Sequence, residues 1–129
     1  MVLFTTGCGG PVGPTTGVVH FEDGTPVKSG SVELRRLSDK ERFSSRIAPD
    51  GTFRPADKDS NVGLPPGNYD AVVVQIVLTE DLAAEDHTHG RTVPRRYADY
   101  YTSDLKVQVN PDQVAPVMIV IKSDESLNP

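Results

Sequence analysis

Two histidines one residue apart form the pair of side chains in this chain best suited to holding a metal ion. In an extended segment the side chains of residues i and i+2 point to the same side, so the imidazoles of His87 and His89 can bind one ion. The pair lies in an acidic stretch, next to Glu85 and Asp86. The pattern therefore allows two readings, a weak metal site at His87 and His89 or a polar loop exposed to solvent, and we favour the loop.

A second oxygen-rich segment begins like a calcium-binding loop. Asp57, Asp59 and Asn61 follow the alternate spacing of the first ligands of such a loop. The sixth position should be glycine and the twelfth glutamate, but this chain has Val62 and Asn68 there. We therefore expect a solvated turn, with calcium binding as the alternative.

Arginines and tyrosines gather in one stretch late in the chain. The members are Arg91, Arg95, Arg96, Tyr97, Tyr100 and Tyr101. Arginine and aromatic residues are favoured where proteins recognise partners, and arginine also stacks on rings. We take this stretch as the candidate interaction loop, for a partner protein, a sugar face or an anionic polymer. The alternative is a loop held on the domain by ion pairs to Asp99 and Asp104.

The only cysteine is Cys8, in the sequence Gly7-Cys8-Gly9-Gly10, which resembles a bacterial lipobox. In such a motif the thiol receives a diacylglycerol, and several acyl chains together anchor a protein firmly. Thr5 stands where leucine is usual, and no Lys or Arg precedes Cys8. We expect Met1 to be an internal start, Cys8 to be a lipid anchor and the protein to lie in the cell envelope. The alternative is a free cysteine in a cytosolic protein.

Composition and charge narrow the class of protein. A net charge of -5 argues against a nucleic-acid binder, which normally carries a basic face. A single cysteine excludes an internal disulfide. Because no apolar run approaches the ~18–20 residues that a membrane-spanning helix needs, we expect membrane contact only through the lipid.

The elements that must position these residues are short strands. With 11 Gly and 11 Pro, the chain is divided into apolar segments rich in β-branched residues. The predicted strands cover residues 16–21, 31–36, 42–47, 52–54, 69–78, 105–109 and 117–122. The strand at 69–78 is apolar on both faces, which predicts a central strand covered on each side. Seven such strands indicate an all-β, seven-stranded antiparallel sandwich.

The remaining segments complete the expected organisation. Residues 1–14 read as a truncated lipoprotein signal remnant and a Gly/Pro tether. Residues 15–122 form the sandwich, residues 79–104 form one long loop within it, and residues 123–129 are a polar tail. Within the long loop, residues 80–85 have the composition of a short helical turn.

Four motifs carry a resemblance to a known family. They are Gly17-Val18-Val19 with the following Asp23-Gly24-Thr25-Pro26 turn, Gly30 to Leu34, Asp50-Gly51-Thr52-Phe53, and Gly67-Asn68-Tyr69. Their order resembles the carboxypeptidase regulatory-like domain, a transthyretin-like (prealbumin-type) Greek-key sandwich. The stretch from Val93 to Asp99 is similar to a subfamily found in planctomycete-type envelope lipoproteins.

The resemblance implies a non-catalytic module with no cofactor and no known ligand. Its partner would be an envelope protein or a polysaccharide, and the oligomeric state stays open. Asp50-Gly51 would close a hairpin, Phe53 would fill the core beside it, and Tyr69 would form a tyrosine corner, with its ring buried and its hydroxyl bonded to nearby backbone.

Two enzyme families related to this fold supply the alternatives. Intradiol dioxygenases hold iron with two tyrosines and two histidines, so the alternative function is a metal-dependent enzyme that uses His87 and His89. Here Tyr69 precedes the histidines and the other tyrosines follow them. Hydroxyisourate hydrolase needs a C-terminal Tyr-Arg-Gly-Ser, whereas this chain ends Ser126-Leu127-Asn128-Pro129, and we set that reading aside.

Overall fold

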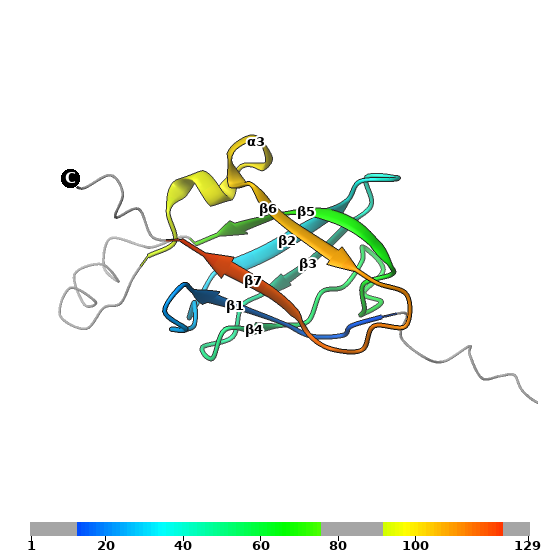
Figure 1. The fold of residues 1–129 in the computed structure, drawn as a ribbon, viewed down its shortest axis with the longest axis horizontal. Coiled ribbons are helices and arrows are strands. Elements are labelled where there is room, and N and C mark those ends of the chain that lie inside the picture. Colours follow the sequence, from blue (N-terminus) through cyan, green and yellow to red (C-terminus); the bar gives the residue numbers. More distant parts are fainter. Residues whose placement is uncertain (1–12, 76–91, 123–129) are drawn as a thin grey trace, which may run out of the picture.

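Seven strands in two facing sheets make up the computed structural model, which describes residues 13–75 and 92–122 (Figure 1). The three-stranded sheet has the order β4-β1-β7, with β1 at Gly17–Phe21, β4 at Thr52–Phe53 and β7 at Val117–Ile121. The four-stranded sheet has the order β3-β2-β5-β6, with β2 at Ser31–Arg36, β3 at Arg42–Arg46, β5 at Gly67–Val74 and β6 at Leu105–Val109. The predicted all-β class and its seven strands are confirmed.

Alternation of side chains explains why these segments are strands with one buried face. In β2, Val32 and Leu34 are buried between the sheets while Glu33 and Arg35 point outward. The tight turns use the expected chemistry, since Gly24 and Gly51 adopt positive φ values of 93° and 89°. The carboxylate of Asp50 accepts hydrogen bonds from the backbone N–H (3.0 Å) and the hydroxyl (2.7 Å) of Thr52, closing the predicted hairpin.

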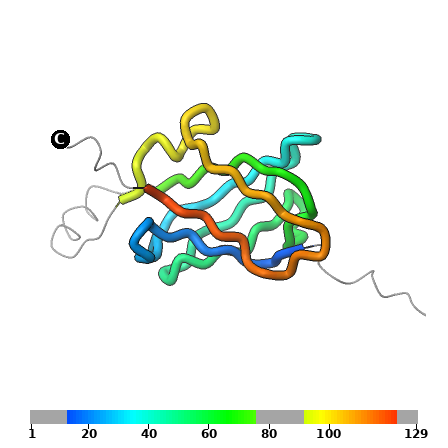
Figure 2. Tube along the Cα trace, viewed as in Figure 1, coloured from blue at the N-terminus to red at the C-terminus, as the bar shows by residue number. Residues whose placement is uncertain are grey.

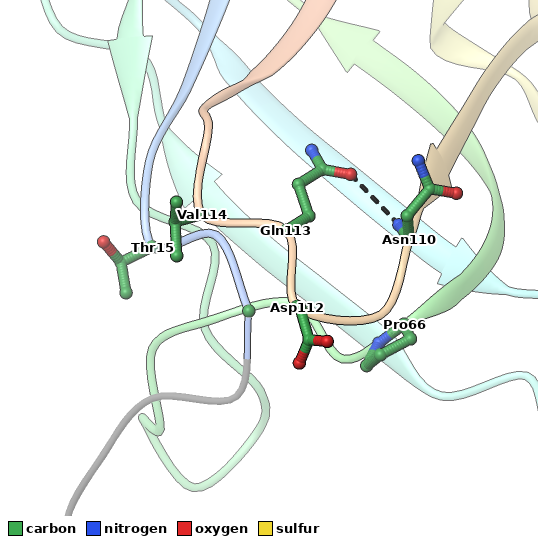
Figure 3. A pocket seen from close by; sticks show the side chains of 7 residues that line it. Thr15, Pro66, Asn110, Asp112, Gln113 and Val114 are labelled. Carbon is green, nitrogen blue, oxygen red and sulfur yellow. Dashed lines mark hydrogen bonds between the residues drawn. The ribbon is translucent and has the colours of Figure 1, made fainter.

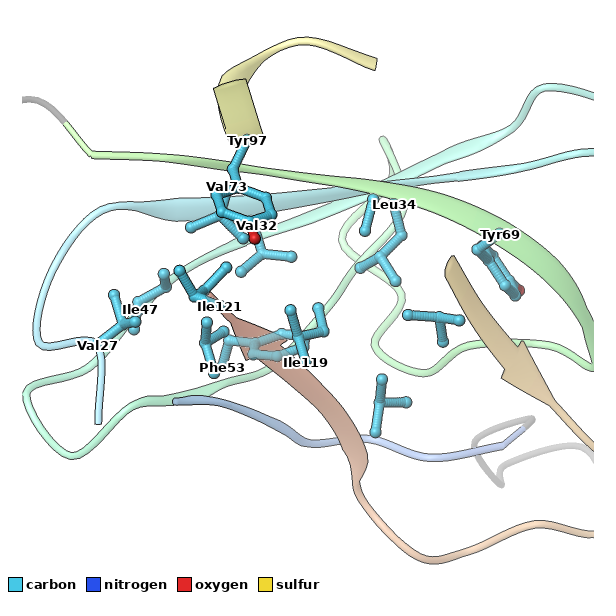
Figure 4. Close-up of a cluster of buried hydrophobic side chains, with 14 of the residues drawn as sticks. Val27, Val32, Leu34, Ile47, Phe53, Tyr69, Val73, Tyr97, Ile119 and Ile121 are labelled. Atoms are coloured by element: carbon cyan, nitrogen blue, oxygen red, sulfur yellow. The ribbon is translucent and has the colours of Figure 1, made fainter. Parts of the chain in front are cut away.

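The core lies between the two sheets (Figure 4). Phe53 is 2% exposed and fills the space beside the Asp50-Gly51 turn, as expected. Tyr69 is 1% exposed, its ring meets Phe43 edge-on at 5.8 Å, and its hydroxyl donates to the carbonyl of Pro65 at 2.5 Å. The tyrosine corner is therefore confirmed in its geometry.

One part of the fold prediction is wrong: the sandwich is not wholly antiparallel. Strands β1 and β7 pair in parallel, with Gly17 opposite Val117 and Phe21 opposite Ile121. The turn after β6 reverses the chain direction, and the chain crosses to the three-stranded sheet, where β7 lies beside β1. Because β1 and β7 then run the same way, the pair is parallel, and the three-stranded sheet is mixed.

The start of the folded unit also differs from the expectation. Pro14, which we assigned to the tether, is fully buried, and its carbonyl accepts a hydrogen bond from the Leu64 N–H at 3.0 Å. Gly13 adopts a φ of 134°, and a Cβ there would lie 1.9 Å from the carbonyl oxygen of Leu64. The backbone therefore already packs on the sandwich at Gly13, two residues before the predicted boundary.

Two short helices cover the outer face of β5. The 3-10 helix η1 spans Arg95–Ala98 and α3 spans Tyr100–Ser103. Val72 points outward from β5 yet is only 4% exposed because η1 and α3 lie over this strand. Figures 1 and 2 show that the described chain begins, in blue, at one end of the sandwich and that η1 and α3 lie over the opposite half. None of the helices described is long and apolar enough to cross a membrane.

Candidate functional site

The predicted interaction residues divide into an inner and an outer set. Tyr97 is buried and Tyr100 is half-buried, whereas Arg95, Arg96 and Tyr101 are exposed. Arg91, the two histidines His87 and His89, and Cys8 lie outside the described residues. Of the five predicted residues that the structure describes, two tyrosines therefore hold the segment in place and three residues face solvent.

Tyr97 is the residue that holds η1 to the core. Its ring is 2% exposed and packs near Val73 and Val32 (Figure 4). Its hydroxyl accepts hydrogen bonds from the Lys122 N–H at 3.1 Å and from Arg96 Nη2 at 2.8 Å. The Arg96 guanidinium also lies 4.3 Å from the ring centroid. Tyr97 thus belongs to the core and not to an interaction surface.

Tyr100 holds α3 against β2. Its hydroxyl donates to Glu33 Oε1 at 3.0 Å, and the Arg35 guanidinium carbon lies 4.0 Å from its ring centroid. Burial, reinforced by the bond to Glu33, raises the pKa of Tyr100. Arg35 is in turn 3.8 Å from Asp70, and its buried Nε has no hydrogen-bond partner among the described residues. Tyr100 therefore presents only part of its ring to the surface.

Hydrogen bonds fix the rest of this segment. The Asp99 carboxylate accepts from the Tyr101 N–H at 2.8 Å and caps α3. The Ser103 hydroxyl, 1% exposed, donates to the Ala71 carbonyl on β5 at 2.6 Å. The Thr102 hydroxyl donates to the Arg96 carbonyl at 2.6 Å. Residues 92–104 are therefore held on the domain by hydrogen bonds and packing. The expected ion pairs to Asp99 and Asp104 are not among the described contacts, since Asp99 caps the start of α3 and Asp104 follows its end.

A shallow hollow separates this segment from the outward faces of β2 and β3. Its volume is about 500 Å³. The lining residues are Ser31, Val32, Glu33, Ser44, Ser45, Arg46, Val72, Val74, Ala98 and Tyr100. Hydroxyls, one carboxylate, one guanidinium and part of an aromatic ring thus converge on one place.

Arg46 lines the hollow, and two more arginines lie on β3 and η1, the elements that border it. Arg42 and Arg46 stand on the outward face of β3, opposite Arg35 and Ser31. Within the described ranges, the guanidinium groups of Arg42, Arg46 and Arg95 form no hydrogen bond or ion pair. Tyr101 on α3 is 96% exposed. We call Arg42, Arg46, Arg95, Tyr100 and Tyr101 the arginine–tyrosine surface.

The two arginines of β3 were not among the predicted site residues. The signal was present, since Arg42, Ser44 and Arg46 occupy alternate positions around the buried Phe43. The sequence pattern could not predict which element of the folded chain lies beside these two arginines. Only the folded chain brings β3 beside α3, more than fifty positions later.

The oxygen-rich loop folds as a turn. The Asp57 carboxylate accepts from the N–H groups of Asp59 at 2.8 Å and Asn61 at 3.0 Å. These backbone donors lower the pKa of Asp57. The carboxylate is therefore directed at its own loop, which is the geometry of the expected turn.

A second hollow, of about 590 Å³, lies at the opposite end of the sandwich near Gly13 (Figure 3). Its lining residues are Gly13, Thr15, Pro66, Asn110, Asp112, Gln113 and Val114. The Gln113 side-chain oxygen accepts from the Asn110 N–H at 3.0 Å and so closes the turn before β7. With one carboxylate and no cationic group in its lining, this hollow offers weaker recognition chemistry than the first.

Three of the four tyrosines, Tyr69, Tyr97 and Tyr100, have hydroxyls engaged in other hydrogen bonds. Tyr69 donates to a backbone carbonyl, and its burial raises its pKa to about 12. Among the described residues no three His, Cys, Asp or Glu side chains are grouped as metal ligands.

Comparison of the chain with protein-family models, curated proteins and solved structures gave no match in any of the three. The chemistry of the surface itself is therefore the basis for inferring function.

Proposed function

We propose that this protein is a non-catalytic binding module that recognises an acidic polysaccharide of the cell envelope through the arginine–tyrosine surface. The observation that carries the proposal is the hollow beside α3, where Arg46, Tyr100 and a row of hydroxyls line one site. On a chain of net charge -5, Arg46 in the hollow and Arg42 and Arg95 on the bordering elements carry positive charges with no described ion pair.

Each group on this surface suits part of an acidic sugar polymer. Guanidinium groups bind carboxylates with paired hydrogen bonds. The exposed ring of Tyr101 offers a flat apolar face with a polar hydroxyl, which fits the face and the rim of a sugar ring. Ser44 and Ser45 supply hydroxyls for sugar hydroxyl groups. A protein partner would meet the same residues, but an open hollow lined by both hydroxyl and apolar side chains favours an extended sugar polymer.

We propose further that the sandwich is of the transthyretin-like, Greek-key type and belongs with carboxypeptidase regulatory-like domains. The strand orders β4-β1-β7 and β3-β2-β5-β6 support this, because β5 returns across the sandwich to lie beside β2 and β7 returns to β1. The hairpin at Asp50 and the tyrosine corner at Tyr69 support it at the level of single residues.

Location in the envelope rests on Cys8 as a lipid anchor. The arrangement of the fold is consistent with this role, since the described chain begins at the end of the sandwich away from η1 and α3 (Figure 1). A module tethered at that end would present the arginine–tyrosine surface away from the membrane. Palmitate labelling of the full-length gene product in its native host tests the anchor, and a Cys8→Ser change should abolish the label.

Isothermal titration of the purified chain with a polygalacturonate oligomer tests the binding function. We expect saturable binding that weakens as salt rises, and none with a neutral dextran oligomer of the same length. Arg46→Gln and Tyr101→Ala should each weaken binding by about tenfold or more, the effect of losing about 1.4 kcal/mol.

Lys58→Gln is the matched control, because it removes one exposed positive charge from a loop outside the hollow. Binding to the neutral oligomer with equal affinity would contradict the proposal. Equal losses of affinity in Lys58→Gln and Arg46→Gln would also contradict it, since they would indicate an effect of net charge alone.

A further inference from the structure

Each sheet ends in two edge strands, and three of the four edges carry features that discourage pairing with another chain. Strand β4 has only two residues. Strand β3 carries two arginines, and Ser44 already exchanges both backbone hydrogen bonds with Ala56, at 2.9 and 3.1 Å. Strand β6 carries Lys106 on its outward face. Short length, charge and local cover are the usual means of protecting an edge.

Strand β7 is the exception among these edges. Its sequence, Val117-Met118-Ile119-Val120-Ile121, contains no charge, no proline and no glycine. Met118 and Val120 are 55% and 40% exposed. A five-residue apolar edge of this kind is a ready template for strand pairing.

The register of the β1–β7 pair shows which backbone groups are available on that edge. The Val117 N–H bonds to the Thr16 carbonyl, and the Ile121 carbonyl accepts from the Glu22 N–H. In a parallel pair, alternate residues of a strand bond to the same neighbour. Val117, Ile119 and Ile121 therefore bond toward β1. The N–H and C=O groups of Met118 and Val120 face away from β1, where no residue in the ranges 13–75 and 92–122 bonds to them.

We propose that the β7 edge binds a second copy of this chain, with the two β7 strands antiparallel about a twofold axis at Ile119. The pairing joins the two three-stranded sheets into one six-stranded sheet. Residue 118 of one copy then lies opposite residue 120 of the other, on the outer face. Met118 and Val120 of both copies form one apolar stripe across the axis, and each supplies the other's missing backbone partners.

Charge favours a second copy as the occupant of this edge. Each chain carries a net charge of -5, so two copies repel one another through most approaches. Strand β7 has no charged residue, and on the outer face β1 contributes Val18 beside Met118 and His20 beside Val120. A twofold contact there brings no like charges together. Because the contact is one strand wide, the dimer is expected to be weak and reversible.

Sedimentation of the full chain under reducing conditions, from about 10 μM to about 1 mM, tests the proposal. The reductant excludes cross-linking through Cys8. We expect a monomer–dimer equilibrium within this range. Met118→Lys and Val120→Lys, both at exposed positions, should raise the dissociation constant at least tenfold. Val114→Lys, which adds the same charge at an 87% exposed position before the strand, should leave it unchanged.

Amide hydrogen exchange of the same samples shows which strand forms the dimer contact. The Met118 and Val120 amides should become more protected as concentration rises, while the Gln108 amide on the β6 edge should not. A purely monomeric chain at about 1 mM would overturn the proposal. So would a dimer that both lysine variants leave intact, or one in which the Met118 and Val120 amides gain no protection.

Discussion

Tyr69, whose ring is buried, and Tyr100, whose ring is half-buried, each donate from the hydroxyl to a single acceptor. Tyr69 donates to the Pro65 carbonyl four residues earlier, whereas Tyr100 donates to Glu33, 67 positions away. The first bond fixes a local corner at the start of β5. The second ties a surface segment to the sheet. These two residues allow separate tests of the corner and of the segment.

Removal of the Tyr69 hydroxyl should weaken the fold without disturbing the ring. We expect Tyr69→Phe to lower the free energy of unfolding by about 1 kcal/mol, the usual net value of one hydrogen bond. Urea unfolding measures the change. Tyr101→Phe, at a ring that is 96% exposed, is the control and should stay within about 0.5 kcal/mol of the parent. Equal effects of the two changes would contradict the corner's role.

Alkaline pH should loosen the α3 segment through Tyr100. Its pKa is raised in the folded state, mainly by burial, above the value of about 10 that it has in the unfolded chain. The folded state therefore favours the neutral phenol, and this stabilisation is present below pH 10 and lost as pH rises through the folded pKa. Stability measured by urea unfolding between pH 9 and pH 12 should fall less steeply in Tyr100→Phe than in the parent. Identical slopes would argue against this coupling.

Single-residue chemistry could be predicted from the sequence only where the partners are near in the chain. The roles of Phe53 and Tyr69 follow from adjacent turn and strand signals. Tyr97 and Tyr100 were predicted as interaction residues, yet both rings serve to hold η1 and α3 on the sandwich. A cluster of arginines and tyrosines has the same composition in either role, and the deciding partner of Tyr100, Glu33, is distant in sequence.

At the scale of elements, Gly17 sets how closely β1 approaches β4. A Cβ at this position would lie 2.2 Å from Cζ of Phe53, its partner in the β1–β4 pair. Gly17→Ala should therefore displace the Phe53 ring and cost about 1–3 kcal/mol of stability, as overpacking usually does.

The double variant Gly17→Ala, Phe53→Leu provides the check on this clash. Leucine leaves room for the added methyl group, so the double variant should be less destabilised than the sum of the two single variants. Thermal unfolding of the four proteins gives the coupling. Strict additivity would mean that the strands move apart and that the clash is not local.

The Ser103 hydroxyl is the buried bond between α3 and β5. We expect Ser103→Ala to cost about 1–2 kcal/mol, because the Ala71 carbonyl loses a buried donor. Amide exchange in α3 should speed up more than exchange in β2. Ser38→Ala, in an exposed turn, is the control. Unchanged exchange in α3 would show that Tyr97 and Tyr100 hold the segment without this bond.

The strands themselves could be predicted from the sequence, but not all of their neighbours. Alternation and turn residues place β2 and β6 at the predicted residues, and apolar residues on both faces of β5 predicted a central strand. The parallel β1–β7 pair was missed because nothing within Val117–Ile121 records the direction of the strand beside it. For the same reason, the position of Arg46 beside α3 could not be foreseen.

At the scale of the whole molecule, acidic pH should destabilise the fold by protonating carboxylates that lie in turns. Hydrogen bonding to Arg36 lowers the pKa of Asp39 to about 2, and donors in their own turns lower the pKa values of Asp50 and Asp57. The stabilisation by these carboxylates is present above pH 4 and lost as pH falls through the folded values. The free energy of unfolding should therefore decline from pH 4 toward pH 2.

Carbon NMR titration of the Asp39 carboxyl group measures its midpoint and so tests whether Asp39 contributes to this loss of stability. Arg36→Gln should move its midpoint upward from about 2 toward the ordinary value of 3.8. Arg54→Gln, at an exposed position on another part of the surface, should leave the midpoint where it is. A midpoint that stays near 2 in Arg36→Gln would assign the shift to the backbone donor of Glu41 instead.

The parallel pairing of β1 and β7 has a mechanical consequence. The chain enters β1 at one end of the sandwich and leaves β7 at the other, with five residue pairs in register between them. Tension between the two ends of the chain would pull these neighbouring strands past each other along their length. All the hydrogen bonds of the ladder would then carry the load together, whereas strands peeled apart from one end break one bond at a time. The fold is thus suited to stay closed when its two ends are pulled in opposite directions.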